Sequence, residues 1–282
     1  MARRLTGQYV LVRIRRERNP VSAKDIAGEA LLLAGGGRAL ILQIAHPAVG
    51  RGVVEHSDFE HRIMQRFHAT VTFIYASVFA TPEQFEVVRR SVNRAHATVR
   101  GASRAEAPAY NAFDPVLQLW VAATLYQTMM VLSERVFGPV PEDDAERLYR
   151  ELIVLGSSLQ VAPEDWPATR SDFEAYWSAG LAQLRSTPET RAVARQILYP
   201  AEIPGWMKAV FPLARLITVG LLPDEVRRDF RLAWNDRLQR RFDRWMRAVT
   251  ILYPLVPARL RHLPRDRYLA RLGHSVTATG AG

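Results

Sequence analysis

The sequence predicts an all-α fold, a single globular domain of many helices. Three observations support this. Apolar residues recur at helical spacing through most of the chain, the segments that carry them have clear start and stop signals, and alternation of period two is nearly absent. Only Val10 to Arg15 alternates, which is consistent with one short strand.

The individual helices follow from apolar stripes and from the residues that flank them. Asp114-Pro115, Pro223-Asp224 and Thr187-Pro188-Glu189 have the residue types that begin helices, whereas glycines and prolines separate the segments. The predicted helices are 23–34, 38–45, 59–79, 82–100, 115–137, 142–159, 172–184, 189–198, 206–221, 224–252 and 265–272. The triple glycine at 35–37 is interpreted as a turn between two of them, because no strand precedes it and no Gly-Lys-Ser/Thr follows.

Composition is that of an ordinary globular protein. The chain has 282 residues, of which 48% are hydrophobic and 23% charged, and no Gly-, Ser- or Pro-rich linker divides it. We therefore expect one domain over residues 1–282, with a basic N-terminal arm at 1–20. The sequence contains no cysteine. Disulfides, a thiolate nucleophile and thiolate ligation of a haem or a metal are thereby excluded.

The formal net charge of +10 comes almost entirely from arginine. Such a charge attracts anions, including haem propionates, nucleic acid and anionic lipid. A GC-rich genome is an alternative explanation, because its codon bias favours arginine over lysine throughout its proteins. Eight arginines crowd into 224–252, but an apolar stripe runs through the same segment and five carboxylates are spaced to pair with the arginines. We therefore expect a solvated amphipathic helix and no nucleic-acid partner.

No segment predicts membrane insertion. The N-terminus begins with basic residues but lacks an apolar core of signal-peptide length. The most hydrophobic later stretch, 206–222, is interrupted by Lys208, Pro212 and Arg215, so it is too short and too charged to span a bilayer. The expectation is a cytoplasmic protein without a transmembrane segment.

His96 is the most informative residue of the chain. Its helix begins at an N-cap, Thr81, with proline next and Gln84 three residues later, and Gly101 is expected to end it. His96 follows Val92 by one turn on the apolar stripe of that helix. A neutral imidazole facing an apolar slot suits a proximal haem ligand, and it equally suits a hydrogen-bonded core histidine. The spacing alone does not decide between them.

Four motifs, taken in their order along the chain, favour a haem ligand over a core histidine. They are LAGGGRALILQIAHP at 33–47, GVVEHS at 52–57, RFHAT at 66–70 and NRAHATVRG at 93–101. Together they resemble the catalytic domain shared by latex clearing protein (rubber oxygenase) and the ER-bound fungal oxygenases of the mycophenolic acid pathway. The similarity extends from about Ala34 to Pro115 and fades into general helical character beyond.

The resemblance implies an all-helical domain that encloses one b-type haem between helices. The histidine that matches His96 would be the axial iron ligand, and the residues that match Arg66 and Thr70 would lie on the opposite, distal side. It also treats Gln43 and His46 as part of a structural or haem-lining turn. Arg66 and Thr70 are four residues apart and so project from one helix face. An arginine there can hold a propionate or negative charge on bound dioxygen.

One position departs from the family pattern. The rubber-cleaving relatives carry a lysine immediately before the threonine, where it can ligate the resting iron, and this chain has Ala69. Alanine cannot ligate. We therefore expect the sixth coordination site to be open, to hold water, or to be filled by another side chain such as His68. The departure also weakens any transfer of polymer-cleaving activity.

Together these observations predict a haem b-dependent oxidoreductase, an oxygenase that acts with dioxygen or peroxide on an apolar, small-molecule or lipid-like substrate. Two alternatives stay open. One is an all-α binding or regulatory protein without turnover. The other is a non-haem metalloenzyme that uses His46, His56, His61 and His68 with the nearby Glu55, Asp58 and Glu60. The sequence does not indicate the substrate, the electron donor or the oligomeric state.

Overall fold

The computed structural model describes residues 22–56, 59–104, 107–201, 203 and 205–279. Within these residues the chain is helical almost throughout, and its ladder structure is confined to 100–111. There β1 (Arg100–Gly101) pairs antiparallel with β2 (Tyr110–Asn111). The predicted all-α class is therefore confirmed. The basic arm at 1–20 and the strand expected at Val10 to Arg15 lie outside the described residues.

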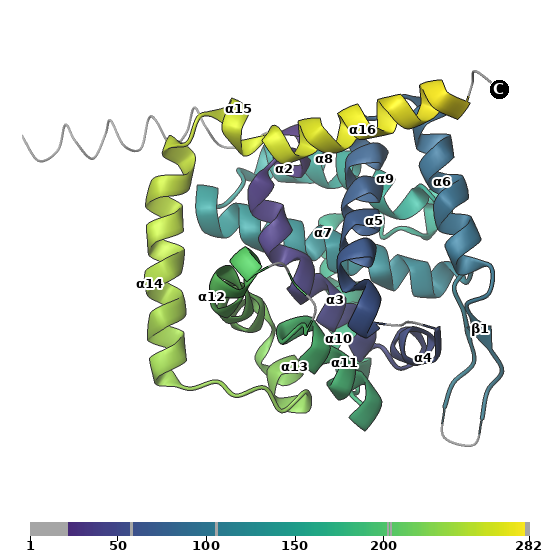
Figure 1. Ribbon diagram of the computed structural model, residues 1–282, viewed down its shortest axis with the longest axis horizontal. Helices are drawn as coiled ribbons and strands as arrows, with labels where there is room; N and C mark the ends of the chain where they lie inside the picture. Colours follow the sequence, from purple (N-terminus) through teal and green to yellow (C-terminus); the bar gives the residue numbers. More distant parts are fainter. Residues whose placement is uncertain (1–21, 57–58, 105–106, 202, 204, 280–282) are drawn as a thin grey trace, which may run out of the picture.

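Helix α7 (Pro115–Phe137) runs through the interior and organises the other helices (Figure 1). It contacts α3 (Gly36–Ala45), the 3-10 helix η1 (Ala30–Gly35), α9 (Val154–Ser157) and α14 (Asp236–Leu252). Most of its residues are buried, on all sides of the helix. The remaining elements are α2 (Ala23–Ala27), α4 (Pro47–His56), α5 (Phe59–Phe79), α6 (Pro82–His96), α8 (Glu142–Leu152), η2 (Pro163–Asp165), α10 (Arg170–Gln183), α11 (Pro188–Leu198), α12 (Gly205–Leu221), α13 (Asp224–Asp229), η3 (Tyr253–Leu255), α15 (Ala258–Arg261) and α16 (Leu263–Thr279).

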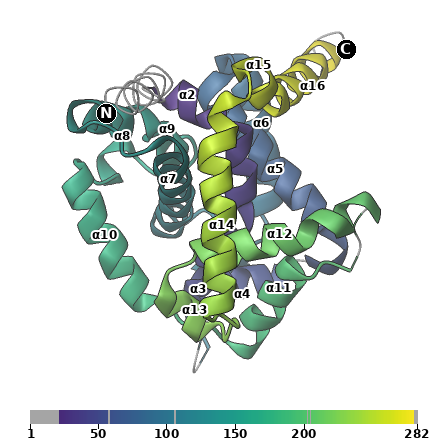
Figure 2. The same cartoon turned by 90° about the vertical axis from the view of Figure 1, so that its left-hand side faces the viewer.

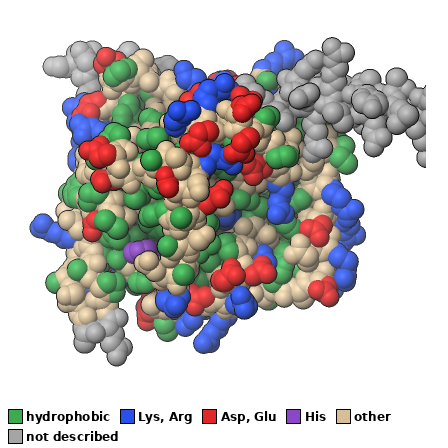
Figure 3. Space-filling model, turned by 180° about the vertical axis from the view of Figure 1, so that it is seen from behind, with side chains coloured by type: hydrophobic (Ala, Val, Ile, Leu, Met, Phe, Trp, Pro, Cys, Tyr) green, Lys and Arg blue, Asp and Glu red, His purple; other side chains and the backbone are tan. Residues whose placement is uncertain are grey.

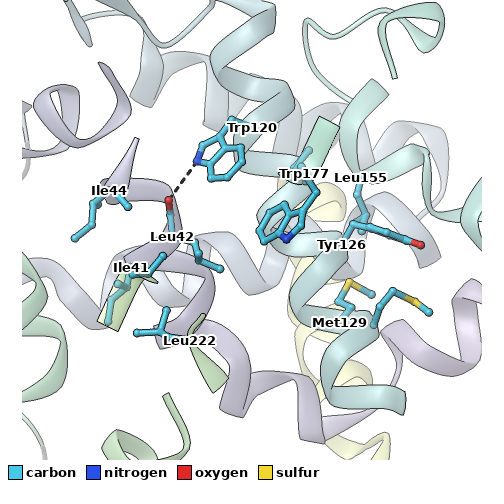
Figure 4. Packing of buried hydrophobic residues seen from close by; sticks show 14 of the residues in the cluster. Ile41, Leu42, Ile44, Trp120, Tyr126, Met129, Leu155, Trp177 and Leu222 are labelled. Atoms are coloured by element: carbon cyan, nitrogen blue, oxygen red, sulfur yellow. Dashed lines mark hydrogen bonds between the residues drawn. The ribbon is translucent and has the colours of Figure 1, made fainter. Parts of the chain in front are cut away.

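The main core forms where α3 crosses α7. Ile41, Leu42 and Ile44 of α3 are fully buried, so this helix has no solvent-facing side at its centre. Figure 4 shows the indole Nε1 of Trp120 on α7 donating a 3.2 Å hydrogen bond to the carbonyl of Leu42. The ring of Trp120 stacks on that of Trp177 from α10 at 5.2 Å. This packing fixes α3, which carries several residues of the site.

Residues that cap helices locally predicted well where several helices begin. Helices α5 and α7 have the predicted bounds. Asp114 caps α7 by accepting from the amide of Val116 at 2.9 Å. Thr81 forms the expected capping box with Gln84, and Thr187 forms one with Thr190. Each of these helices satisfies its first amide groups within four residues, which is why the sequence alone indicates them.

The predicted helix 224–252 is wrong as one element. It is divided into α13 and α14. Arg231 adopts φ 55°, the left-handed region, and this ends the first helix. Asp229 is the last residue of α13, and its carboxylate accepts from the amide of Ser186 while its carbonyl accepts from the Ser186 hydroxyl instead of from a further turn of helix. Asn235 then caps α14 at the amide of Leu238.

Two further predicted helices are interrupted, and two α-helices among the described residues, α4 and α15, were not predicted. The segment 23–34 breaks after Ala27 and continues as η1, and 142–159 breaks at Ile153 between α8 and α9. Helix α4 was not predicted, although it follows directly on Pro47. Turns of 3-10 type at these joints satisfy the backbone while redirecting the chain.

The helix that carries His96 ends earlier than predicted. His96 is the last residue of α6, Ala97 is the C-cap, and Gly101 belongs to β1. A Cβ on Gly101 would lie 2.5 Å from Cε1 of Tyr110, so glycine is required here for close approach of the hairpin strands. The glycine is therefore a packing residue and not a helix cap.

The triple glycine is likewise not a turn. Gly35 ends η1, Gly36 begins α3 with φ −55° and ψ −41°, and the chain stays helical across the junction. A Cβ on Gly35 would lie 2.5 Å from Thr128 on α7, and one on Gly37 would lie 2.5 Å from Thr218 on α12. The glycines therefore let three helices approach closely.

Salt bridges follow the sequence prediction on α13 only. Arg227 pairs with Asp224, and Arg228 pairs with Glu225 at 3.9 Å. On α14, where Asp236 and Asp243 were expected to offset the arginines, no arginine forms a salt bridge within the described part of the chain. Asp243 instead accepts from the side-chain amide of Gln239 at 2.9 Å. The arginines of α14 are exposed and lack a carboxylate partner there.

One described helix, α7, is long and apolar enough to cross a membrane, and two-thirds of its apolar window is buried inside the protein. The bent pair formed by Ala30–Ala45 and Pro47–His56 passes the same test only when its two arms are combined across a 105° bend. Both pack in the core, as the core helices of many globular proteins do.

Candidate functional site

An apolar cavity of about 320 Å³ lies between the N-terminal helices and α5, α7, α11 and α12. This volume is near the lower end of the range for small-molecule sites. Its wall is mostly aliphatic and aromatic, with Leu32, Leu40, Phe67, Met129 and Phe211 from five different elements. Such a wall binds an apolar ligand by removing its surface from water.

Close packing of glycines forms one side of this cavity. Gly36 lies against Phe67 of α5, where an added Cβ would be 3.0 Å from Cε2 of that ring. Gly37 lies against Thr218 of α12. Both glycines line the cavity, together with Gly35. The narrow join of η1 and α3 thus brings α5 and α12 to opposite walls of one space.

Among the described lining residues, polar side chains are few and none is acidic. Arg66, Thr70 and Gln43, three of the predicted site residues, all line the cavity. Arg215 and Tyr75 are two further polar lining residues. The described lining contains two arginines and no aspartate or glutamate, so the cavity combines apolar walls with two basic side chains. Burial lowers the pKa of the Arg66 guanidinium.

His96 is the last residue of α6 and lies beside Arg66 of α5. Burial lowers the pKa of its imidazole, and the positive charge of Arg66 lowers it further. The ring packs edge-on against Phe113 with centroids 6.3 Å apart. Its Nδ1 is buried and has no hydrogen-bond partner. His96 is not itself among the lining residues. Arg66 is therefore the residue that connects His96 electrostatically to the cavity.

His46 and Gln43 are separated by the fold, although they are three residues apart. Gln43 faces the cavity and donates to the hydroxyl of Thr124 at 3.1 Å. His46 instead lies against Trp120, with ring centroids 6.1 Å apart, and is not a lining residue. Burial lowers the pKa of His46, and its Nδ1 has no hydrogen-bond partner. The structure therefore groups Gln43, but not His46, with Arg66.

His68 faces away from the cavity. It is exposed, and its Nδ1 is hydrogen-bonded to the hydroxyl of Tyr268 on α16. Ala69 is exposed and is not a lining residue, whereas Thr70 lines the cavity and is also exposed. Thr70 therefore lies at the rim of the cavity, and Arg66, one turn earlier, lies deeper.

The histidine cluster of the non-haem alternative does not assemble among the described residues, since no group of three or more His, Asp or Glu side chains there is placed to hold a metal ion. His56 contacts the Tyr110 hydroxyl at 2.8 Å, and that hydroxyl donates to Glu55 at 2.6 Å. These two residues therefore brace the hairpin. Asp58 lies outside the described residues, and the side chains of Glu60 and His61 are not described.

Two buried residues near the cavity were not predicted from the sequence. Tyr75 is 2% exposed, its hydroxyl has no hydrogen-bond partner, and burial raises its pKa to about 12. Arg38 is also 2% exposed and donates to the carbonyl of Leu221 at 2.8 Å and to Thr128 at 2.5 Å. Burial lowers the pKa of Arg38 to about 10. Tyr75 follows the periodicity of α5, but no local pattern distinguishes Arg38 from an exposed arginine.

One protein family matches most of the chain. Residues 24–251 match the family described as "ER-bound oxygenase mpaB/B'/Rubber oxygenase, catalytic domain". The chain belongs to this family. The match begins within α2 and ends one residue before the end of α14, so it includes every described residue that lines the cavity. The predicted resemblance is confirmed, and the domain is an oxygenase catalytic domain.

Two relatives are 34% identical to this chain over 227 residues. They are the uncharacterised proteins Mb2261 of Mycobacterium bovis and Rv2237 of Mycobacterium tuberculosis, and the match covers 78% of this chain and 88% of each relative. No solved structure matches.

Proposed function

We propose that this protein is a haem b-dependent oxygenase for an apolar, lipid-like or small-molecule substrate, with His96 as the axial ligand. One observation supports this most directly. The buried Nδ1 of His96 has no hydrogen-bond partner, and the neighbouring Arg66 lines an apolar cavity. Membership of an oxygenase family supports turnover over the alternative of a binding protein.

The side chains present fit haem b in donor type and in charge. A haem is a large apolar ring that carries two carboxylates, so it needs apolar walls, a nitrogen ligand and cationic groups. The cavity offers apolar walls with Arg66 and Arg215, and the described lining contains no carboxylate that would repel the propionates. In the absence of cysteine, the ligand must be a nitrogen or oxygen donor. His96 supplies the nitrogen.

The environment of His96 keeps it in the form that can ligate. A metal ligand must be the neutral imidazole, because the protonated ring has no free lone pair. Burial and the charge of Arg66 both lower the pKa of His96 below its ordinary value of 6.5. The ring is therefore neutral at pH 7. Its position at the last residue of α6, held by the capped helix behind it, fixes where the nitrogen lies.

Arg66 and Thr70 would stabilise negative charge on an oxygen atom in the cavity that both residues line. The Arg66 guanidinium stays charged although burial lowers its pKa, and it offers a planar fork of donors. Thr70, one turn along α5, offers a hydroxyl at the rim. In a site shielded from water, such donors act strongly on charge that develops on an oxygen atom.

Haem b, when bound, supplies the activation of dioxygen or peroxide, and the protein supplies binding, orientation and exclusion of water. The aliphatic wall holds an apolar substrate by hydrophobic burial. Among the described lining residues, the uncharged polar ones besides threonines are Tyr75 and Gln43, so most of the cavity surface makes no hydrogen-bond demands. Ala69 provides no ligand of its own.

The test is haem titration of the His96→Ala variant, followed by the Soret band and by far-UV circular dichroism. We expect loss of stoichiometric haem binding with the helical content retained, because His96 lies at a helix end and only partly in the core. The matched control is His68→Ala, which removes an exposed histidine bound to Tyr268 and should leave the Soret band unchanged. Full haem occupancy with an unchanged spectrum in His96→Ala would refute the assignment.

A further inference from the structure

Exposed apolar side chains gather at one corner of the molecule, where α14 turns through η3 and α15 into α16. Figure 1 shows this turn at the upper left, with α14 descending from it. Ile251, Leu252, Leu255, Leu260 and Leu263 are between 39% and 65% exposed, and all lie within thirteen consecutive residues. We call these five residues the apolar corner. The other described large apolar residues with such exposure are Val116, Tyr199, Val210 and Trp245.

The apolar corner is held rigidly from beneath. Arg261 is buried and forms a 2.6 Å salt bridge with Glu29, which is also buried. The hydroxyl of Tyr253 donates to the same carboxylate at 2.8 Å and accepts from the amide of Leu31. η3 and α15 are thereby fixed to η1. The exposed leucines are displayed on a fixed support, because two partly buried hydrogen bonds and a buried ion pair would break if this corner rearranged.

A row of arginines leads along α14 to the apolar corner. Arg240, Arg244 and Arg247 are exposed and follow one another at steps of four and three, and Ile251 continues the same helix face. We call these three arginines the basic face. None of them forms a salt bridge within the described residues. Figure 2 places α14 at the front of the molecule, and Figure 3, seen from behind, shows arginine side chains along the edge where α14 lies.

Carboxylates near this surface are already engaged or distant. Asp243 accepts from Gln239, and Asp266 pairs with Arg265 at 2.8 Å. Asp236 lies at the opposite end of α14 from the apolar corner. Helix α14 carries five arginines and two aspartates, so the surface combines net positive charge with contiguous apolar area, the combination that lets a peripheral protein bind an anionic bilayer.

Charge selects among the possible occupants. A second copy of this chain carries the same net charge of +10, and the segment 1–21 contains six arginines and a single glutamate, so both are repelled by the basic face. A nucleic acid satisfies the arginines but gains nothing from five exposed aliphatic side chains. Only an anionic lipid surface satisfies both features, because its headgroups pair with arginine while leucines enter the acyl boundary.

We propose that the apolar corner and the basic face together bind the surface of a bilayer that contains anionic phospholipid. Binding places α14 along the headgroups, with the five aliphatic side chains inserted at one end. The proposal is independent of the haem assignment. It adds a location at a bilayer surface, where lipid-like molecules are concentrated.

Vesicle flotation of the full-length protein tests this. We compare phosphatidylcholine vesicles with vesicles that also contain 30% phosphatidylglycerol (about a third of the headgroups, enough to give a negative surface potential). We expect binding to the anionic vesicles only, weakened as salt increases. Replacing Arg244 and Arg247 together by glutamine should reduce the partition constant by about thirtyfold, since each basic residue near such a surface contributes about 1 kcal/mol. The triple variant Leu252→Ser, Leu255→Ser and Leu260→Ser should reduce it at least tenfold.

Matched controls separate location from net charge and general hydrophobicity. Arg150→Gln with Arg195→Gln removes the same charge from exposed positions on α8 and α11, and Val116→Ser removes an exposed apolar side chain from α7. Both should bind vesicles as the wild type does. All changes are at exposed positions, so unchanged circular dichroism is expected.

Four outcomes would overturn the proposal. They are absence of binding to anionic vesicles, equal loss in both double arginine variants, unaltered binding of the triple serine variant, and self-association in sedimentation velocity that the triple serine variant abolishes while no vesicle binding is seen. Competition by a duplex nucleic acid that depends on the arginines and not on the leucines would reassign the surface to nucleic-acid binding.

Discussion

Substitution of Gly37 by alanine tests the approach of α12 to α3, on which the cavity depends. An added Cβ would lie 2.5 Å from Oγ1 and 3.0 Å from Cγ2 of Thr218. Thr218 is branched at Cβ and 5% exposed, so its γ atoms can give way only by a change of rotamer that also alters the cavity wall to which they belong. Overpacking of this kind costs about 1–3 kcal/mol. Alanine in a helix returns up to about 1 kcal/mol relative to glycine. We therefore expect a net loss of about 1–2 kcal/mol in the free energy of unfolding.

The assay is urea unfolding followed by circular dichroism, completed as a double-mutant cycle with Thr218→Ala. That second change removes both atoms nearest the new methyl group and leaves only the Thr218 Cβ, which is 3.3 Å away. The double variant should regain about 1 kcal/mol or more over Gly37→Ala, a favourable coupling. Gly273→Ala in α16 is the control, because its nearest neighbour would be 3.7 Å away. It should stabilise the protein slightly.

A Gly37→Ala variant that is more stable than the wild type would refute this reasoning. It would mean that helix propensity acts alone and that α12 does not approach α3 at this point. The cavity would then be open on that side, and the α12 residues would not form part of its wall. Zero coupling in the double-mutant cycle would lead to the same conclusion.

Two further predictions concern single side chains of the site. Arg66→Gln should raise the pKa of His96 towards its ordinary value, because a positive neighbour is removed while burial remains. Titration of the His96 ring by NMR measures this pKa. An unchanged pKa would mean that the two side chains do not interact. The depressed pKa of His96 also makes the wild-type fold lose stability as pH falls through 6.5, since the unfolded chain binds the proton first, and Arg66→Gln should diminish that loss. Tyr75→Phe should raise the melting temperature, because the buried hydroxyl has no partner and its burial costs about 1 kcal/mol or more. Tyr149→Phe is its control and should lower the melting temperature, since that hydroxyl bonds the carbonyl of Pro167; a destabilised Tyr75→Phe would show that the hydroxyl has a ligand.

The sequence by itself determined the helices whose ends carry their own signals. Helices α5 and α7 follow uninterrupted apolar stripes, and Thr81 and Asp114 satisfy the first amide groups of their helices through local contacts. Such contacts span four residues at most, so they can be predicted from the amino-acid sequence. The family motifs likewise indicated Arg66, Thr70 and Gln43, which the fold brings to one cavity.

The tertiary structure decided what depends on distant residues. The break between α13 and α14 follows from Asp229, which bonds Ser186 forty-three residues away. The burial of Arg38 depends on acceptors from α7 and α12, and the separation of His46 from Gln43 depends on how α3 lies against Trp120. Helical periodicity says which face of a helix is apolar. It does not say which other helix covers that face, and the cavity, the burial of charge and the exposed corner at 251–263 all follow from that packing.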